Sequence, residues 1–348
     1  MRFAMTADQS DLRAVVHDLV TELCPPATVR CAPDSAEVAA LHRGLVDLGV
    51  PGLLVSEGAG GLGLDENHFV ALMVECGWAA VPLPLVDTVG FAPAVLESAG
   101  PARSGPLGPD LAGSDLVADV VAGKTTCAVT FDGVVRFGHR PGLLLHGGFG
   151  GVGPIRVLDL AGASREPVDA VDPAADLRRI IGGTELVVVD DPAAVELAWL
   201  RGVLGASAQL IGLSRRMLET TVEYVGQRRQ FGVPIGSFQA VKHRLADALL
   251  RIEFAAPAVA RAGFSLATSD PDRVRDVSMA KALASDAARE VARAAIQCHG
   301  AIAYTTEYDL HLYAKRAWAL AADWGSAAWH RAVVARDLGL PFTGTPAS

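Results

Sequence analysis

The feature that most constrains this fold is a set of four long segments with helical periodicity after residue 191. The first carries apolar or small residues at three-to-four spacing from Leu200 to Tyr224, and the others span 238–265, 274–297 and 308–338. At about 1.5 Å per residue, helices of this length are as long as a small domain is wide. Four such helices with apolar stripes predict an antiparallel bundle.

Helical patterns also dominate the first hundred residues. Asp8 or Ser10 is a suitable cap for a first helix, and Asp34 or Ser35 is a suitable cap for the next one. A third helix is expected over 66–78, after a glycine-rich break.

Between these helical parts the chain changes to short Val- and Leu-rich runs separated by Gly, Pro and Asp, a pattern that predicts strands joined by turns. The expected strands lie at 116–121, 127–131, 143–145, 155–160 and 186–189. We therefore expect a mostly α chain with a small central β domain. The predicted boundaries are a helical domain at 1–100, a short β domain at 101–190 and a helical bundle at 191–348.

Composition narrows the class of partner and the compartment. The net charge of −9 argues against nucleic acid, because a phosphate backbone selects for clustered Lys and Arg. The five cysteines are scattered without a CxxC pair, so we expect no zinc or redox site and reduced thiols in a cytoplasmic protein. The apolar stretch 76–96 contains three prolines and Asp87, so it predicts a buried, kinked segment and no membrane span.

Three motifs resemble nucleotide or metal sites but lack the features that such sites require. Residues 148–153 match GxGxxG, but Pro154 and an extended run follow where a nucleotide loop needs a helix, so we expect a turn in the β domain. The glycine-rich run 57–64 lacks the lysine of a phosphate loop and is interpreted as structural. His299 and His311 have no ligand partners at metal-binding spacing, so no metal is expected.

Two polar turns between the long helical segments carry more chemistry. In the first, spanning 228–243, the planar fork of Arg228 suits a pyrophosphate, Phe231 could pack on an adenine, and Gln239 offers both a donor and an acceptor. The second turn spans 297–305. By themselves these turns could equally be solvated connections between helices.

In context, the first turn resembles the Tyr-x-x-x-Arg-x-x-Phe-Gly…Phe-Gln run of the acyl-CoA dehydrogenase family, a family of flavoproteins. The second resembles the family's Gln-x-x-Gly-Gly-x-Gly-Tyr segment, with Ala301 and Ala303 where glycines are usual. The run 57–64 resembles a turn between the family's N-terminal helices. The resemblance implies the acyl-CoA dehydrogenase fold and an FAD cofactor. The cofactor contacts that it implies are Arg228, Gln230, Phe231, Gln239, Gln297, Gly300 and Ala301.

The same resemblance shows what this chain lacks. The family's catalytic glutamate in a Glu-Gly-Thr/Ser run corresponds to Trp324, which cannot accept a proton. The family's other base position falls near Arg201–Gly202, and neither residue is a base. Asp323 and Glu196 are the remaining candidates, and no catalytic residue is assigned. The runs that hold the flavin ring in catalytic members are not found in 101–190.

The chain therefore resembles the non-catalytic, β-type subunit of actinobacterial heterotetrameric acyl-CoA dehydrogenases that act on steroid side-chain CoA thioesters. The resemblance implies an α2β2 complex in which a catalytic paralogue supplies the base, the ring site and most of the acyl-CoA site. This chain would then be inactive alone. Two alternatives remain open: a self-sufficient homo-oligomeric flavin oxidase or monooxygenase of the same fold, and a structural partner without flavin.

Overall fold

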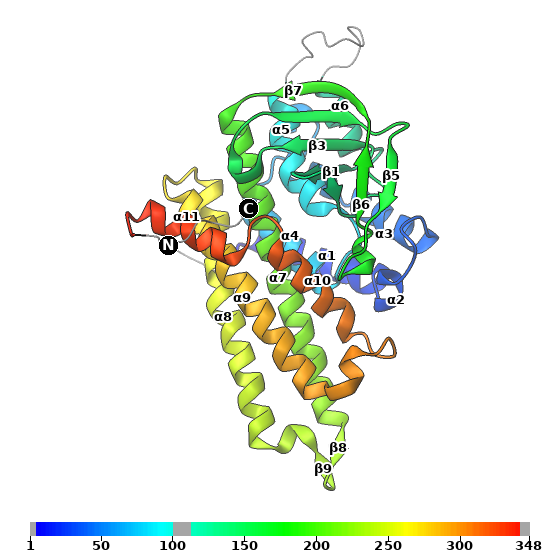
Figure 1. The fold of residues 1–348 in the computed structure, drawn as a ribbon, viewed down its shortest axis with the longest axis vertical. Coiled ribbons are helices and arrows are strands. Elements are labelled where there is room, and N and C mark those ends of the chain that lie inside the picture. The colour runs from blue at the N-terminus through cyan, green and yellow to red at the C-terminus, as the bar shows by residue number, and fades with distance from the viewer. Residues whose placement is uncertain (1–4, 100–112, 342–348) are drawn as a thin grey trace. The chain divides into compact units, whose positions relative to one another are not determined.

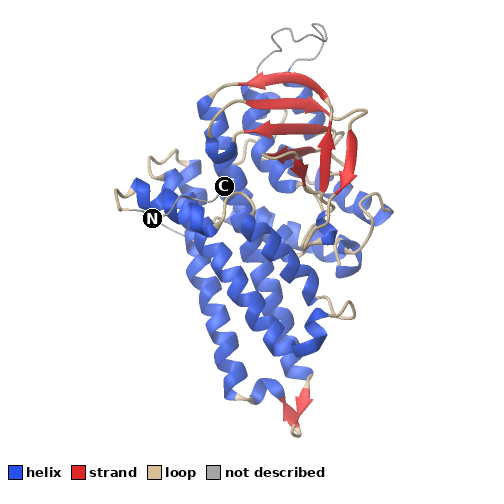
Figure 2. Cartoon of the chain, in the orientation of Figure 1, coloured by secondary structure: helices blue, strands red, loops and turns tan. Residues whose placement is uncertain are grey.

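The computed structural model describes residues 5–99 and 113–341. Its elements are mostly helical, with a small set of strands (Figures 1 and 2). The chain forms two compact units. The first unit consists of Met1–Val20, Val70–Val81 and Ala206–Ser348, and the second consists of Thr21–Phe69 and Pro82–Gly205.

The first unit is a helical bundle that uses the long segments expected from the sequence. Three of the four segments form single helices, and α8 packs along α9 (Figure 1). They are α7 (Pro192–Gln227), which belongs to this unit from Ala206 onwards, α8 (Gln239–Ala267) and α9 (Arg273–His299). The buried side of α9 is mostly alanine, which favours the helix and lets its neighbours approach closely. The bundle is completed by α10 (Leu310–Ala322) and α11 (Ala327–Asp337), both packed on α9.

The prediction of one helix over 308–338 was wrong, because the chain turns between α10 and α11. Trp324 and Gly325 both have positive φ, at 54° and 86°. The side chain of Ser326 then caps α11 by accepting a hydrogen bond from the Trp329 N–H at 3.2 Å. Apolar spacing continues through both helices, so periodicity alone did not reveal the break.

The N-terminal helices agree with the sequence in position but not at every cap. The helix α4 (Glu66–Trp78) has the predicted bounds, and Ser35 caps α3 (Ala36–Asp47) by accepting from the Val38 N–H. The start of α1 (Ala7–Leu23) is fixed by Thr6 instead of Asp8 or Ser10. Thr6 Oγ1 accepts from the Gln9 N–H, and the Gln9 side chain accepts from the Thr6 N–H, which is a reciprocal capping box.

Glycines allow α4 and α7 to cross at backbone contact within the first unit. A Cβ on Gly77 would lie 2.3 Å from the Gln209 carbonyl oxygen, and one on Gly212 would lie 1.9 Å from the Val74 carbonyl oxygen. Neither contact could be relieved by moving a side chain, because backbone atoms lie in the way. This crossing fixes α4 against the helix that leads to the first of the two polar turns.

The second unit holds short helices and the strands. Its helical elements include α2 (Pro26–Val29), α3, the 3-10 turns η1 (Val50–Gly52) and η2 (Glu57–Ala59), the π-helix η3 (Val86–Phe91), α5 (Ala92–Ser98) and α6 (Gly113–Val121). The stretch 76–96 is largely buried and contains the end of α4, η3 and the start of α5, as a buried kinked segment should. Among the described helices, none has both the length and the apolar character needed to cross a bilayer.

A four-stranded sheet has the order β1-β3-β4-β7, in which only the β1–β3 pair is parallel. A three-stranded antiparallel sheet has the order β2-β6-β5. The strands are β1 (Cys127–Thr130), β2 (Val134–Val135), β3 (Leu143–Gly147), β4 (Ile155–Asp159), β5 (Ser164–Pro167), β6 (Arg178–Ile181) and β7 (Thr184–Val189). Four of the five predicted strands are confirmed.

The fifth, at 116–121, was wrong, because that run is the end of α6. Its buried residues Leu116, Val117 and Val120 recur at helical spacing, which a short apolar run does not distinguish from a strand. The strands β2, β5 and β6 were missed because they are short or polar. The GxGxxG-like residues 148–153 lie in the connection from β3 to β4, with a 3-10 turn at Phe149–Gly151 followed by the strand β4, so the expected turn is confirmed.

Side chains of the π-helix η3 cover the outer edge of β1. Asp87 Oδ2 accepts the Val129 N–H at 2.9 Å, and Thr88 Oγ1 accepts the Cys127 N–H at 3.0 Å. These two backbone groups would otherwise be the open hydrogen-bonding edge of the sheet. The contacts satisfy that edge and prevent it from pairing with another chain.

Candidate functional site

The first polar turn is a β-hairpin that projects from the bundle between α7 and α8 (Figure 1). Its strands β8 (Arg229–Gln230) and β9 (Val233–Pro234) pair antiparallel around a two-residue loop, Phe231–Gly232. Both loop residues have positive φ, at 52° and 83°, as a type I′ hairpin requires. Glycine adopts this backbone freely, but a phenylalanine does so at a cost of about 1 kcal/mol. We call Arg228–Gln239 the tip.

The tip presents Phe231 almost entirely to solvent. The ring is 91% exposed, and its nearest aromatic neighbour is the edge of Phe238 at a centroid distance of 6.2 Å. An apolar ring that is both strained and exposed contributes nothing favourable to the isolated fold. The ring is therefore free to contact another molecule without rearrangement of the fold.

The two arginines of the tip are held differently. Arg229 donates to the Gly232 carbonyl at 3.1 Å and so closes the hairpin. Both backbone polar groups of Arg228 are hydrogen-bonded. Its N–H donates to the Tyr224 carbonyl and its carbonyl accepts from the Ile235 N–H, each at 2.8 Å. The Arg228 side chain is exposed. Arg228 is thus a guanidinium on a rigid backbone, directed to solvent.

The second polar turn follows α9. Gly300 ends the helix with φ 67° and ψ −143°, and the 3-10 turn η7 (Gly300–Tyr304) begins there. Gln297, Gly300 and Ala301 are exposed, whereas Ala303 is 2% exposed and faces the interior. Of the two alanines at usual glycine positions, only Ala301 therefore presents its methyl group to solvent.

An aromatic stack joins the ends of α7, α9 and α10. The ring of His299 lies on that of Tyr224 at 4.3 Å and 21°, and Tyr308 meets both rings at 5.6 and 4.9 Å. His299 donates from Nδ1 to the Ala295 carbonyl at 2.8 Å, and burial lowers its pKa, which favours the neutral ring. The stack brings the two polar turns to the same end of the bundle, and His299 belongs there as a packing residue that sequence reasoning assigned no role.

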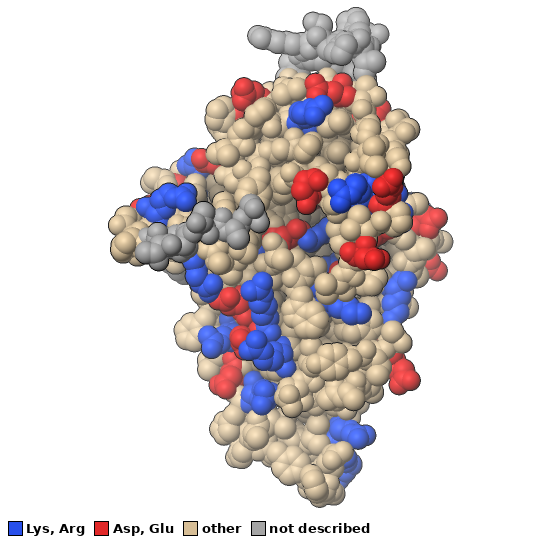
Figure 3. Space-filling view, in the orientation of Figure 1, with Lys and Arg blue, Asp and Glu red and all other residues tan. Residues whose placement is uncertain are grey.

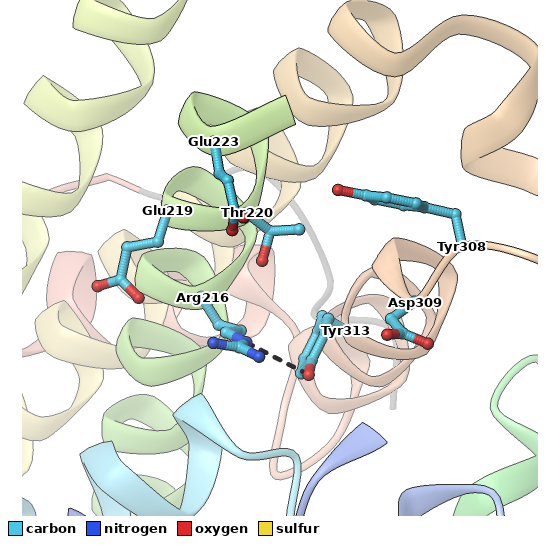
Figure 4. Close-up of a pocket in the computed structure, with 7 residues that line it drawn as sticks. All are labelled: Arg216, Glu219, Thr220, Glu223, Tyr308, Asp309 and Tyr313. Atoms are coloured by element: carbon cyan, nitrogen blue, oxygen red, sulfur yellow. Dashed lines mark hydrogen bonds between the residues drawn. The ribbon is translucent and has the colours of Figure 1, made fainter. Parts of the chain in front are cut away.

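A cavity of about 400 Å³ opens beside this stack (Figure 4). One face of α7 and the start of α10 line it, with the side chains of Arg216, Glu219, Thr220, Glu223, Tyr308, Asp309 and Tyr313. Arg216 stacks on Trp78 at 4.3 Å and donates to the Tyr313 hydroxyl at 3.3 Å. Three carboxylates surround this single guanidinium, so the cavity is unsuited to a phosphate.

Trp324, the residue that the family resemblance places at the base position, lies in the turn between α10 and α11. Trp324 is 6% exposed, and its carbonyl accepts from His330 Nε2 at 2.8 Å. Lys281 is fully buried and donates to the carbonyls of Gly325 at 3.1 Å and Ala321 at 3.3 Å. Two buried side chains therefore fix the shape of this turn. Asp323 is the C-cap of α10 and has an extended backbone, so a turn and not a continuous helix links it to Trp324.

The second possible base position lies in the second unit. Arg201 on α7 forms an ion pair with Glu66 at 2.9 Å, and both side chains are largely buried. Glu66 is thus the carboxylate beside this position, although no sequence pattern indicated it because 135 residues separate the two. Glu196 lies one turn earlier on α7, where Gly151 approaches its backbone.

The described residues contain no group of three or more His, Cys, Asp or Glu side chains arranged to hold a metal ion. The seven cofactor contacts implied by the family resemblance all lie in the first unit. Four are on the tip, Gln297 is in the last turn of α9, and Gly300 and Ala301 are on the turn that follows it. What the arrangement offers chemically is recognition of an anionic, aromatic ligand, with no proton acceptor among these seven residues.

Relatives of this chain are acyl-CoA dehydrogenases. Acyl-CoA dehydrogenase IpdE2 of Mycobacterium tuberculosis is 33% identical over 322 residues, covering 88% of this chain and 89% of its own. Acyl-CoA dehydrogenase FadE34 of the same organism is 34% identical over 312 residues, covering 85% of this chain and 42% of its own.

Solved structures show the same fold at lower identity. A chain of the ChsE4–ChsE5 complex from Mycobacterium tuberculosis superposes with a TM-score of 0.79 at 22% identity, over 100% of both chains. A chain of the Tcur3481–Tcur3483 steroid ACAD gives 0.78 at 20% identity, over 95% of this chain and 98% of that one. Residues 6–102 match the N-terminal domain of acyl-CoA dehydrogenases, and residues 193–339 match the C-terminal domain. The chain therefore belongs to the acyl-CoA dehydrogenase family.

Proposed function

We propose that this chain is the non-catalytic subunit of a heteromeric acyl-CoA dehydrogenase. Its tip and the turn after α9 bind the ADP part of an FAD whose ring is held by a catalytic paralogue in an α2β2 complex. The complex desaturates an acyl-CoA between its α and β carbons, with a steroid side-chain thioester as the favoured substrate. The bound flavin supplies the hydride acceptor for that reaction.

The observation that carries the proposal is the exposure of Phe231. An aromatic ring that is 91% exposed on a strained hairpin is favourable only when another surface covers it. Three residues earlier on the same hairpin is Arg228, whose backbone is fixed and whose side chain is exposed. An exposed aromatic ring and an exposed guanidinium on one hairpin suit the adenine and the pyrophosphate of one nucleotide.

The helix ends around the tip fit the same ligand. Gln239 begins α8, so the positive end of that helix dipole lies near Arg228 and favours phosphate. Gln297 lies at the C-terminal end of α9, where carbonyl groups and the Gln297 amide favour hydrogen-bond donors such as ribose hydroxyls and the adenine amino group. The two turns would therefore hold different parts of the nucleotide.

The residues at both base positions support a non-catalytic role. Trp324 is buried within its own turn, and Glu66 is held in an ion pair with Arg201. The sequence from 101 to 190 also lacks the runs that hold the flavin ring. A paralogue with a Glu-Gly-Thr/Ser run would supply both missing parts. The structurally similar Tcur3481–Tcur3483 protein is a steroid ACAD, which favours a steroid substrate for the complex of this chain as well.

The test is co-expression of this chain with each paralogue of the same genome that carries a Glu-Gly-Thr/Ser run. FAD per chain, molecular mass and acyl-CoA-dependent reduction of a dye would be measured. We expect the chain alone to be colourless and inactive, and the complex to be yellow and active. Arg228→Ala should weaken FAD retention by about 10- to 100-fold, because a charge-assisted hydrogen bond contributes roughly 1.5–3 kcal/mol.

Arg156→Ala is the matched control, since Arg156 is an exposed arginine on β4 that pairs with Glu185. It should leave FAD retention unchanged. A chain that binds one FAD by itself and turns over substrate would support the self-sufficient flavoenzyme instead. Unchanged FAD content in the Arg228→Ala complex would support the structural partner without flavin.

A further inference from the structure

The cavity of about 400 Å³ beside the aromatic stack takes no part in the proposed nucleotide contacts. Its volume is in the range of sites for small molecules, about 300–1,000 Å³. All of its lining residues belong to the first unit, some from α7 and the others from residues 308–313 at and before the start of α10. We call it the α7–α10 cavity. Its walls are polar and aromatic, and their chemistry indicates what it can hold.

Two carboxylates of the α7–α10 cavity accept hydrogen bonds from neutral donors. Glu219 accepts from the Trp78 indole N–H at 2.7 Å, and Glu223 accepts from the Gln227 amide at 3.1 Å. Neither carboxylate forms an ion pair within the part of the chain that the structure describes. A third carboxylate, Asp309, lines the cavity from the α10 side (Figure 4). The cavity therefore has an excess of negative charge over the single guanidinium that lines it.

Aromatic rings at this cavity already hold one cation. The Arg216 guanidinium lies 4.3 Å from the centre of the Trp78 ring and 5.5 Å from that of the Tyr313 ring. It also donates to the Tyr313 hydroxyl at 3.3 Å. Aromatic faces attract cations through the negative charge density above the ring. Tyr308 adds a second phenol, whose ring extends into the cavity toward α7 (Figure 4).

Burial and charge act together on Tyr308. Burial raises the pKa of its phenol, and the carboxylates of Glu223 and Asp309 raise it further. The negative charges of these two side chains therefore act on the part of the cavity next to this ring, and the phenol stays neutral at physiological pH. A neutral hydroxyl can accept a hydrogen bond from an ammonium group while the carboxylates balance its charge.

Other classes of ligand fit this cavity poorly. An anion would meet three carboxylates, and an apolar molecule would remove water from them without replacing its hydrogen bonds. The described residues contain no group of three or more His, Cys, Asp or Glu side chains that could hold a metal ion. Over the helical bundle, Figure 3 shows Lys and Arg interleaved with Asp and Glu, so this visible face offers a cation no broad acidic patch.

We propose that the α7–α10 cavity binds an alkylammonium group, with Glu223 and Asp309 as its counter-ions and Tyr308 as its aromatic wall. A free diamine and a lysine side chain both carry this group. Because the carboxylates come from α7 and from the α10 side, a short diamine with a charge at each end suits the cavity better than a single amine. None of the lining residues is among the seven nucleotide contacts, so the site is independent of the proposed function.

The experiment measures binding to the full chain by isothermal titration calorimetry at low ionic strength. The probes are putrescine, Nα-acetyl-lysine methylamide as a model of a lysine side chain, and butanediol as a neutral analogue. Putrescine should bind and butanediol should not. Glu223→Gln and Asp309→Asn should each weaken putrescine binding about 10-fold, because a charge-assisted hydrogen bond is lost. Circular dichroism of each variant would establish that folding is retained.

Glu307→Gln is the matched control, because Glu307 is an exposed carboxylate two residues before Asp309 that does not line the cavity. It should leave putrescine binding unchanged. Tighter binding of putrescine would identify a free diamine as the ligand, and tighter binding of the lysine model would identify a side chain of a protein partner. Binding of neither amine, or equal losses in Glu307→Gln and Asp309→Asn, would overturn the inference. Displacement of putrescine by ADP would also overturn it, because the cavity would then belong to a nucleotide site.

Discussion

Two turns of this protein have almost the same backbone and opposite surroundings. Phe231–Gly232 has φ values of 52° and 83°, and Trp324–Gly325 has 54° and 86°. In each, an aromatic residue takes a left-handed conformation that costs about 1 kcal/mol, and a glycine follows it. Phe231 is 91% exposed, whereas Trp324 is 6% exposed.

The difference shows what stabilises each turn. The Trp324 turn is stabilised by buried hydrogen bonds within the chain. His330 donates to the Trp324 carbonyl, and Lys281 donates to the Gly325 carbonyl. The tip is held only locally by its own hairpin bonds, and its ring has solvent on most sides. Strain that is offset by burial is a structural feature, and strain left uncovered indicates binding. The four predictions below test that distinction in order of expected effect.

The largest effect is expected for Trp324→Glu. Removing a buried indole costs about 3–5 kcal/mol, and the new carboxylate would be buried as well. We expect a loss of about 4 kcal/mol in the free energy of unfolding by urea denaturation. We also expect no acyl-CoA-dependent reduction of a dye by the variant chain alone. Trp324→Phe is the control and should lose less stability. Turnover by Trp324→Glu alone would show that the chain holds a complete ring site.

Lys281→Ala should cost about 3 kcal/mol. It leaves the buried carbonyls of Ala321 and Gly325 without their donor and opens a cavity. Lys281→Met separates the two causes, because it retains most of the volume but not the hydrogen bonds. Lys124→Ala is the matched control, since that lysine side chain is 71% exposed, and it should change stability by less than about 0.5 kcal/mol. A loss below about 1 kcal/mol for Lys281→Ala would mean that the turn is held by other contacts.

His330 should make the Trp324 turn sensitive to acid. Burial lowers the pKa of His330 from 6.5 to about 3, and Lys281 contributes in the same direction. Below pH 6.5 the unfolded chain therefore binds a proton that the folded chain does not, and stability falls as pH falls. The share due to His330 is about 2 kcal/mol between pH 7 and pH 5. Urea denaturation at both pH values should show this slope reduced by that amount in His330→Gln. Equal slopes in the two proteins would contradict the assignment.

The smallest effect on stability is expected for Phe231→Gly. Glycine relieves the left-handed strain but gains freedom in the unfolded chain, so stability should stay within about 1 kcal/mol of wild type. FAD retention in the complex should nevertheless fall several-fold, because the aromatic ring is lost. Phe231→Ala removes the ring but keeps the left-handed backbone strain. It should therefore lose as much FAD as Phe231→Gly, without any gain in stability from relief of the strain. Retention of FAD by both variants would mean that the exposed ring has another purpose.

Local sequence signals predicted most elements where the signal and the packing agree. Helix α4, the Ser35 cap and strands β1, β3, β4 and β7 were found from periodicity and turn residues. The errors arose where one short pattern fits two structures. Residues 116–121 have apolar residues that suit a strand or a helix, and packing selected the helix. Thr6 was passed over as a cap because the reciprocal bond with Gln9 depends on where the helix begins.

For the candidate site, the residue types came from the sequence and their arrangement did not. The motif around Arg228 identified a possible nucleotide contact, and Gln297 identified the second turn. That both turns lie at one end of the bundle depends on the stack of Tyr224 on His299, residues separated by a whole helix pair. The ion pair of Arg201 with Glu66 is likewise a contact between distant segments. Neither contact can be predicted from the periodicity of the sequence, because each involves a single side chain from each of two distant segments.

The sequence by itself determined that this protein is a helical chain with a small β part. It also supplied the residue types, among them Arg228, Phe231 and Trp324, on which the proposed function depends. Only the tertiary structure decided that Trp324 is buried and Phe231 is exposed, although both occupy an aromatic–glycine turn. The physical reason is that local residues set backbone conformation, whereas burial depends on which distant segments pack over it. At Trp324 those segments bring Lys281 and His330, and at Phe231 the described chain leaves the ring uncovered.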